Sequence, residues 1–135
     1  MRRWLSSSVE ATRRVGRELA DELAPDRALL LSGDLGAGKT ALVAGLAEGL
    51  GIDPAEIQSP TFTLVREHRG PAGRLLHFDL YRLEAEDVVA AGFEELLLGP
   101  GVKAVEWAER LSFDLPGALR LELRGSGADR IIEER

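Results

Sequence analysis

The sequence predicts an α/β fold with three layers, in which helices flank a central sheet of mixed parallel and antiparallel strands. Three observations support this. A strand-like apolar run, a glycine-rich loop and a helix-forming run follow one another over residues 28–47, two β-rich segments flank a turn at 70–73, and residues 119–124 alternate apolar with charged side chains. Helices that follow buried strands favour layered sheets, and tight turns between strands favour antiparallel pairs. A chain of 135 residues suits one hydrophobic core, so we expect a single domain over residues 1–135.

The first elements follow from periodicity and capping signals. Apolar residues recur at helical spacing from Val9 to Leu23, and Ser7 followed by Glu10 is typical of a capping box, so we expect a helix from about Ser8 to Leu23. The apolar residues 28–31 predict a buried strand. The remaining expected elements, in chain order, are a helix from near Lys39 to Gly49, a short helix at 53–56, an antiparallel hairpin of 61–68 with 74–80, a helix at 84–91 with a further turn at 93–98, a buried strand at 102–107, an antiparallel strand at 119–124 and a strand at 130–132 that pairs back on it.

The segment from Gly33 to Thr40 fits the phosphate-binding pattern G-x-x-x-x-G-K-[ST] without a mismatch. Glycines allow the backbone to curl so that its N–H groups point at phosphate oxygens, and the following helix directs the positive end of its dipole at the same anion. Lys39 can add a charge at the β- and γ-phosphates, and the Thr40 hydroxyl can bind Mg²⁺. A plain helix-capping turn would leave the three glycines unexplained. The residues expected to bind the nucleotide here are Gly33, Asp34, Leu35, Gly36, Ala37, Gly38, Lys39 and Thr40, with no role for the Asp34 side chain itself.

Two acids end predicted buried strands and are the candidates for holding the metal. Asp79 closes the strand of residues 75–79, and Glu106 closes the strand of residues 102–106. A carboxylate at the end of an apolar strand is costly unless a partner compensates it, and a shared Mg²⁺ would do so. The alternative is a strand-end carboxylate in water. We therefore expect Lys39, Asp79 and Glu106 to be the catalytic residues.

Other polar residues near the predicted site have more than one interpretation. The segment Ser59–Thr63 lies where a nucleotide-dependent switch would be expected, although its hydroxyls could equally satisfy local backbone groups. Glu106 is the first choice for orienting the attacking water, with Glu109 and Thr61 as alternatives. For His77 a structural role is favoured, and Trp107 could belong to the core or lie near the nucleotide.

Composition narrows the class of protein. The net charge of −6 argues against a chain that grips nucleic acid by itself, since phosphate backbones require basic patches. The chain has no cysteine, no signal-peptide pattern and no apolar run that approaches a membrane span. We therefore expect a soluble, cytoplasmic protein without disulfides.

Four ordered segments together resemble the TsaE family, also called YjeE. They are Gly33–Thr40, Ser59–Leu64, His77–Leu83 and Val105–Leu111. The resemblance implies a small bacterial ATPase that binds ATP and Mg²⁺, hydrolyses ATP weakly alone, and supports the partner proteins TsaB and TsaD in forming threonylcarbamoyladenosine at position 37 of tRNA. It also implies that Thr40 and Asp79 serve the magnesium ion, that Glu106 is needed for activity, and that Thr12 lies toward the nucleoside.

Two other functions remain open at this point. A small-molecule kinase would share the loop, but such enzymes usually add a mobile lid, and no insertion is long enough to form one. A nucleotide-sensing module, in which ATP orders the switch segment and hydrolysis is dispensable, would use the same residues. The absence of an Asn-Lys-x-Asp motif favours ATP over GTP.

Overall fold

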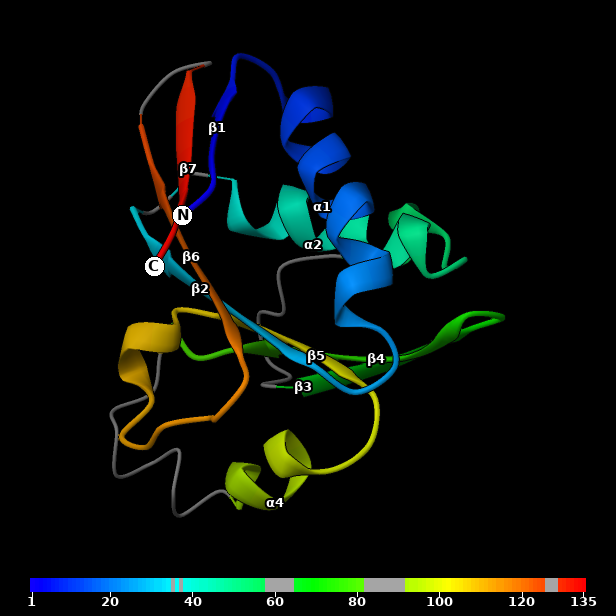
Figure 1. The fold of residues 1–135 in the computed structure, drawn as a ribbon. Coiled ribbons are helices and arrows are strands. Elements are labelled where there is room, and N and C mark those ends of the chain that lie inside the picture. Colours follow the sequence, from blue (N-terminus) through cyan, green and yellow to red (C-terminus); the bar gives the residue numbers. More distant parts are fainter. Residues whose placement is uncertain (35, 37, 58–64, 82–91, 126–128) are drawn as a thin grey trace.

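A single twisted sheet forms the centre of the computed structural model, which describes residues 1–34, 36, 38–57, 65–81, 92–125 and 129–135 (Figure 1). Within those residues the sheet has seven strands in the order β1–β7–β6–β2–β5–β4–β3. The strands are β1 (Arg3–Ser6), β2 (Ala28–Gly33), β3 (Val65–Gly70), β4 (Gly73–Asp79), β5 (Val102–Glu106), β6 (Leu119–Arg124) and β7 (Arg130–Glu134). The helices are α1 (Val9–Leu23), α2 (Lys39–Gly49) and α4 (Phe93–Leu98), with 3₁₀ turns η1 (Pro54–Glu56) and η2 (Ala108–Arg110).

The sheet has a parallel centre and antiparallel edges, so the predicted mixed sheet is confirmed. β2 pairs in parallel with both β5 and β6, and β4 pairs in parallel with β5. At one edge β3 runs antiparallel to β4, and at the other β7 runs antiparallel to β6 and β1 to β7. The expected antiparallel pairing of residues 119–124 with the strand that begins at 130 is confirmed by β6 and β7, and β6 has β2 as a second, parallel neighbour that its alternating pattern did not indicate.

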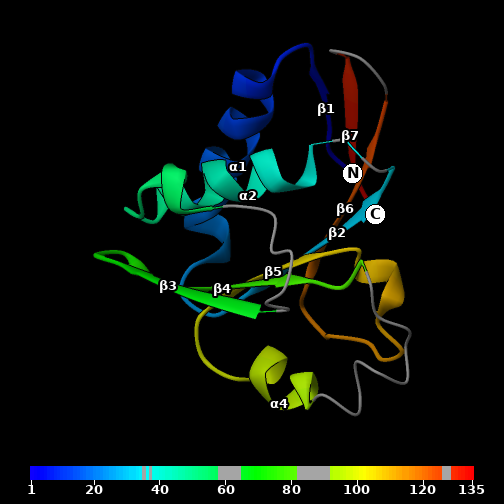
Figure 2. The ribbon, with the colours of Figure 1, turned by 180° about the vertical axis from the view of Figure 1, so that it is seen from behind.

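Helices cover both faces of this sheet (Figures 1 and 2). α1 and α2 lie on one face, where they bury Leu29 and Leu31 of β2, while α4 lies on the other face over Leu30 and Val105. Because β2 is covered on both sides, its sequence is a continuous apolar run rather than an alternating one. The three layers predicted from the sequence are therefore present.

The helices α1 and α2 pack closely where they cross, because each has a glycine at the crossing. A Cβ on Gly45 of α2 would lie 1.8 Å from the carbonyl oxygen of Arg13, and one on Gly16 of α1 would lie 2.1 Å from that of Leu42. Only residues without a side chain permit such an approach. The crossing fixes α2, and with it the start of the helix that carries Lys39, against α1.

The N-terminal region corrects two details of the sequence prediction. Residues 3–6 form a strand that the sequence did not indicate. The N-cap of α1 is Ser8, whose side chain accepts a hydrogen bond from the Ala11 amide at 3.0 Å, so the assignment of Ser7 was wrong. Because β1 ends at Ser6, only Ser7 and Ser8 connect it to α1. Val9, the first residue of the helix, is exposed.

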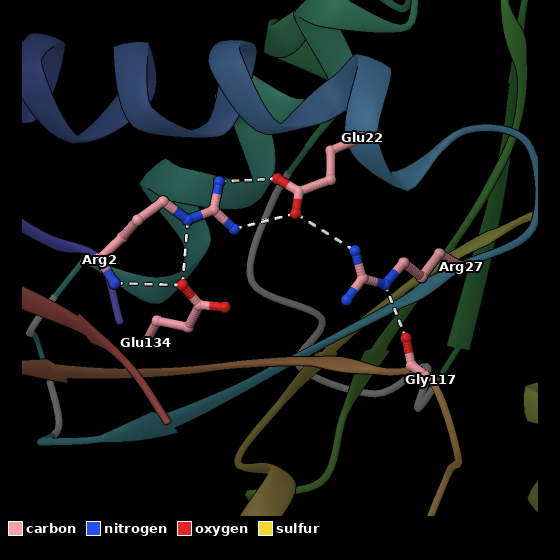
Figure 3. Close-up of polar contacts among 5 residues, drawn as sticks. All are labelled: Arg2, Glu22, Arg27, Gly117 and Glu134. Carbon is pink, nitrogen blue, oxygen red and sulfur yellow. Dashed lines mark hydrogen bonds and ion pairs between the residues drawn. The ribbon is translucent and has the colours of Figure 1, made fainter.

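A chain of charged contacts ties the N-terminus to three other parts of the fold (Figure 3). The Arg2 guanidinium makes two hydrogen bonds, of 2.8 and 2.9 Å, to the Glu22 carboxylate at the end of α1, and a third of 3.0 Å to Glu134 of β7. Glu22 also accepts from Arg27, whose Nε donates to the carbonyl of Gly117 at 2.6 Å. These contacts hold β1, α1 and the turn before β6 together.

The remaining local predictions are mostly confirmed. Gly70 and Gly73 pair across a two-residue turn and close the predicted hairpin, η1 begins after the Asp53 cap, and residues 93–98 are helical. The expected helix at 84–91 and the start of the first hairpin strand at 61–64 lie outside the described residues. No helix in the described part of the chain combines the length and apolar character needed to cross a bilayer.

Candidate nucleotide-binding and catalytic site

The glycine-rich loop begins at the carboxyl end of the central strand β2 and is pressed against β6. Gly33 has φ of 122°, and a Cβ at this position would lie 1.9 Å from the carbonyl oxygen of Leu123. That same carbonyl accepts the amide of Asp34 at 3.2 Å. A residue with a side chain could not make this turn, so Gly33 sets the path by which the chain leaves the sheet.

Lys39 is the first residue of α2, as predicted, and its side chain curls back over the loop. Its ammonium donates to the carbonyls of Gly33 at 2.9 Å and Asp34 at 2.7 Å, and lies 4.2 Å from the centroid of the Trp107 ring. Burial lowers the pKa of Lys39, while the nearby carboxylates, Glu109 foremost, oppose that shift. A buried cation at the start of a helix is well placed to meet an anion.

The two predicted strand-end acids lie side by side. Asp79 of β4 and Glu106 of β5 are register partners on adjacent parallel strands, and both are buried. Partners in register point to the same face of a sheet. Glu106 contacts the first turn of α2, where the Thr40 hydroxyl lies 2.9 and 3.0 Å from its two carboxylate oxygens. The structure therefore brings Thr40, Glu106 and Asp79 to one end of the sheet, with Lys39 next to Thr40 in the chain.

His77 belongs to the same cluster, which the sequence interpretation did not foresee. Its ring is fully buried, and Nε2 lies 2.5 Å from Oε2 of Glu106. The β4–β5 register opposes His77 to Ala104, two residues before Glu106, so the two side chains meet diagonally across the strands. Because side chains alternate along a strand, the sequence places His77 and Asp79 on the same face of the sheet. The contact of His77 with Glu106 depends in addition on the register between β4 and β5, which the sequence does not give.

Two residues that follow β5, Trp107 and Glu109, contact the glycine-rich loop and Lys39. Trp107 has φ of 60°, a conformation that costs a residue with a side chain about 1–2 kcal/mol. Its ring lies under Lys39 and against Tyr81, with ring centroids 4.9 Å apart. Glu109 accepts a hydrogen bond from the Gly33 amide at 3.3 Å. Trp107 is partly buried against the core cluster that contains Phe78 and Val105, and it also borders the phosphate-binding loop through Lys39. The geometry therefore agrees with both interpretations of this residue.

Two further residues border the loop. Thr12 of α1 is buried, its methyl group would lie 3.4 Å from a Cβ placed on Gly38, and its hydroxyl hydrogen-bonds with that of Ser6 at 2.7 Å. Arg130 of β7 donates to the carbonyl of Gly36 at 2.9 Å, a contact that no local sequence signal indicated. Of the other expected site residues, Leu35, Ala37 and the segment Ser59–Thr63 lie outside the described residues.

The oxygen groups at this site suit Mg²⁺ bound together with a phosphate. Among the described residues, no three His, Cys, Asp or Glu side chains form a protein-only metal cage. Mg²⁺ does not need one, because it is usually bound by one or two carboxylates and completes its shell with water and phosphate oxygens. Proteins with this loop hold Mg²⁺ with the loop hydroxyl and a carboxylate, and here the Thr40 hydroxyl lies beside the Glu106 carboxylate, whose neighbour on β4 is Asp79.

The chain matches known proteins over nearly its whole length. The family model described as threonylcarbamoyl adenosine biosynthesis protein TsaE matches residues 6–132. A Synechocystis protein named tRNA threonylcarbamoyladenosine biosynthesis protein TsaE is 49% identical over 76% of this chain and 68% of its own length. The Bacillus subtilis protein of the same name is 38% identical over 94% and 80%, respectively.

A solved structure agrees with these sequence matches. The crystal structure of Bacillus subtilis YdiB superposes with a TM-score of 0.72 at 32% identity, covering 97% of this chain and 82% of that one. Residues 6–132, which the family model matches, include the loop, both acidic strand ends, β6 and the start of β7. The chain belongs to the TsaE family.

Proposed function

We propose that this protein binds ATP with Mg²⁺ at the loop of residues 33–40 and hydrolyses it in support of threonylcarbamoyladenosine formation on tRNA. The observation that carries the proposal is the meeting of Lys39, Thr40 and Glu106 at the start of α2. Membership of the TsaE family, whose curated members are named for this tRNA modification, supports the pathway.

Binding of the triphosphate follows from the loop and the helix. The N-terminus of α2 and the Lys39 ammonium present positive charge at the place where the backbone turns. When the ammonium of Lys39 turns to phosphate oxygens, it would leave the carbonyls of Gly33 and Asp34, which would then accept hydrogen bonds from water or from another donor. Charge-assisted hydrogen bonds of this kind are worth about 1.5–3 kcal/mol each.

Hydrolysis requires that a water molecule and the departing phosphate be held in line. Bound Mg²⁺ would neutralise charge on the β- and γ-phosphate oxygens, with Thr40 and Asp79 as its protein ligands. Glu106 is our choice for orienting the attacking water, since it is buried and fixed by two neighbours. Glu109, which contacts the Gly33 amide, and Thr61, which lies outside the described residues, remain the alternatives.

TsaB and TsaD are the proposed partners, and the family assignment supports them. The net charge of −6 makes a direct grip on tRNA unfavourable. An acidic nucleotide-binding protein is better suited to act on the proteins that carry out the transfer. We further propose that the protein acts in the cytoplasm, where tRNA is modified.

Phosphate release from Mg-ATP tests the proposal, because the chain offers a matched pair of lysines. Lys39 and Lys103 are its two lysines, both are buried, and both donate to two backbone carbonyls. We expect slow release by the wild type that rises on addition of TsaB and TsaD. Lys39→Met should weaken ATP binding about tenfold to hundredfold, whereas folded Lys103→Met should bind like the wild type.

The opposite results would refute different parts of the proposal. Equal ATP affinity in Lys39→Met and the wild type would remove the loop from nucleotide binding. A rate indifferent to TsaB and TsaD would separate the activity from tRNA modification. Formation of a phosphorylated small molecule in place of free phosphate would indicate a kinase.

A further inference from the structure

His77 lies in the interior beside the proposed catalytic carboxylate, and it is one of the two neighbours that contact Glu106. It is fully buried on β4, and its Nε2 lies 2.5 Å from Oε2 of Glu106. We propose that His77 is a positioning residue that holds the Glu106 carboxylate in the orientation required for ATP hydrolysis. This inference rests on the proposed ATPase function.

The hydrogen-bond pattern assigns the roles of the two ring nitrogens. An ionised carboxylate only accepts hydrogen bonds, so Nε2 must carry the proton that is donated to Glu106. The other nitrogen, Nδ1, is buried and has no hydrogen-bond partner among the described residues. The contact with Glu106 is therefore the one hydrogen bond that the described residues give this ring. With the proton at Nε2, His77 is a fixed donor aimed at one carboxylate oxygen.

Glu106 depends on this donor because its other contact has a second task. Glu106 is 3% exposed, and a buried carboxylate requires hydrogen-bond donors. The Thr40 hydroxyl supplies one, but the same oxygen is the proposed magnesium ligand and belongs to the helix that follows the phosphate loop. His77 comes instead from the sheet, next to the strand of Glu106. It is therefore the contact that can stay unchanged while the loop binds and releases nucleotide.

Two amide substitutions separate this role from general stability. Glutamine can place an amide N–H close to the position of His77 Nε2, whereas asparagine ends near Nδ1 and falls short of Glu106. His77→Gln should therefore keep the contact that His77→Asn loses. The matched control is His68→Asn, at the chain's other histidine, which is also largely buried but lies on β3 with its ring 3.9 Å from the Glu56 carboxylate.

The measurements are kcat for phosphate release, ATP affinity by equilibrium binding, and the thermal unfolding midpoint. We expect His77→Asn to lower kcat about tenfold to hundredfold, as loss of supporting contacts does elsewhere, with ATP affinity changed less than about threefold. His77→Gln should recover most of kcat, and His68→Asn should match the wild type. In a Glu106→Gln background, His77→Asn should cause little further loss, since it acts through Glu106.

Three results would overturn the proposal. They are a His77→Asn kcat within about twofold of the wild type, equal losses in His77→Gln and His77→Asn, and an undiminished effect of His77→Asn in the Glu106→Gln background. A His77→Asn variant that does not fold would show that His77 serves stability, and it would likewise overturn the positioning role. A wild type without ATP hydrolysis, alone or with TsaB and TsaD, would instead refute the proposed function.

Discussion

Replacing Gly45 with alanine tests whether the close crossing of α1 and α2 is required. A Cβ on Gly45 would lie 1.8 Å from the carbonyl oxygen of Arg13, whereas real Cβ contacts stay beyond 3.0 Å. The two helix backbones would therefore have to separate by about 1 Å or more, which a close-packed interior resists. The contact is between backbone and Cβ, so no side-chain rotation can relieve it.

The expected loss of stability is the difference between two effects. Overpacking in a core costs about 1–3 kcal/mol and sometimes more, while alanine gains up to about 1 kcal/mol over glycine inside a helix. Because the clash is with backbone, we take the cost at or above the upper end and expect a net loss of about 2 kcal/mol. For a chain of this length that loss lowers the unfolding midpoint by about 6–10 °C.

Thermal and urea unfolding of a small glycine-to-alanine series would measure this effect. Gly16→Ala should behave similarly, because its Cβ would lie 2.1 Å from the Leu42 carbonyl oxygen. Gly49→Ala should cost less, because its clash is with the Ala20 side chain at 2.5 Å and at the end of α2, where the helix can shift. A Gly45→Ala variant as stable as the wild type would refute the close crossing.

Three further predictions concern catalysis, pH and surface charge. Thr40→Val removes the hydroxyl that contacts Glu106 and is proposed to bind Mg²⁺. Phosphate release should therefore fall at least tenfold at any Mg²⁺ concentration. Full activity at high Mg²⁺ would contradict the role of Thr40 as a magnesium ligand. Burial lowers the pKa of Lys103 in the folded state below its ordinary value of 10.5. At a pH between the lowered pKa and 10.5, the unfolded chain binds more protons than the folded one, so the free energy of unfolding should rise with pH. Urea titrations across that window should show a smaller rise for Lys103→Met, and an equal rise would exclude Lys103 as its source. Arg2→Ala should cost no more than about 1 kcal/mol, since its ion pairs are partly exposed, and that cost should shrink in high salt; a loss that is large and independent of salt would mean that the Figure 3 contacts act through packing.

Features set by neighbours in sequence could be predicted from the chain alone. The Gly70–Gly73 hairpin, the cap at Asp53 and the start of α2 at Lys39 each depend on a few consecutive residues, and the structure has all three. Asp79 and Glu106 each end an apolar run, and this position in the sequence predicts a role for both carboxylates. Their location at the same end of the sheet then follows from the parallel pairing of β4 with β5.

Features set by distant pairing could not be predicted in this way. The four residues of β1 are too few to show a period, and their pairing with β7 joins the two ends of the chain. The alternation in β6 reports one buried face but not the direction of its neighbours, so its parallel pairing with β2 was missed. The contacts of His77 with Glu106 and of Arg130 with Gly36 depend on registers between segments far apart in sequence.

The most direct test of the proposed function is the yield of threonylcarbamoyladenosine per TsaD in a reaction reconstituted with TsaB, tRNA, an activated threonylcarbamoyl donor, Mg-ATP and this protein. The informative comparison is between the wild type and an Asp79→Asn variant that is first shown to bind ATP and to release no phosphate. We predict repeated turnover with the wild type and about one turnover or fewer with the variant, because we expect ATP hydrolysis to reset the TsaB–TsaD complex between turnovers. Equal yields would contradict it and would leave ATP binding alone as the function of this site.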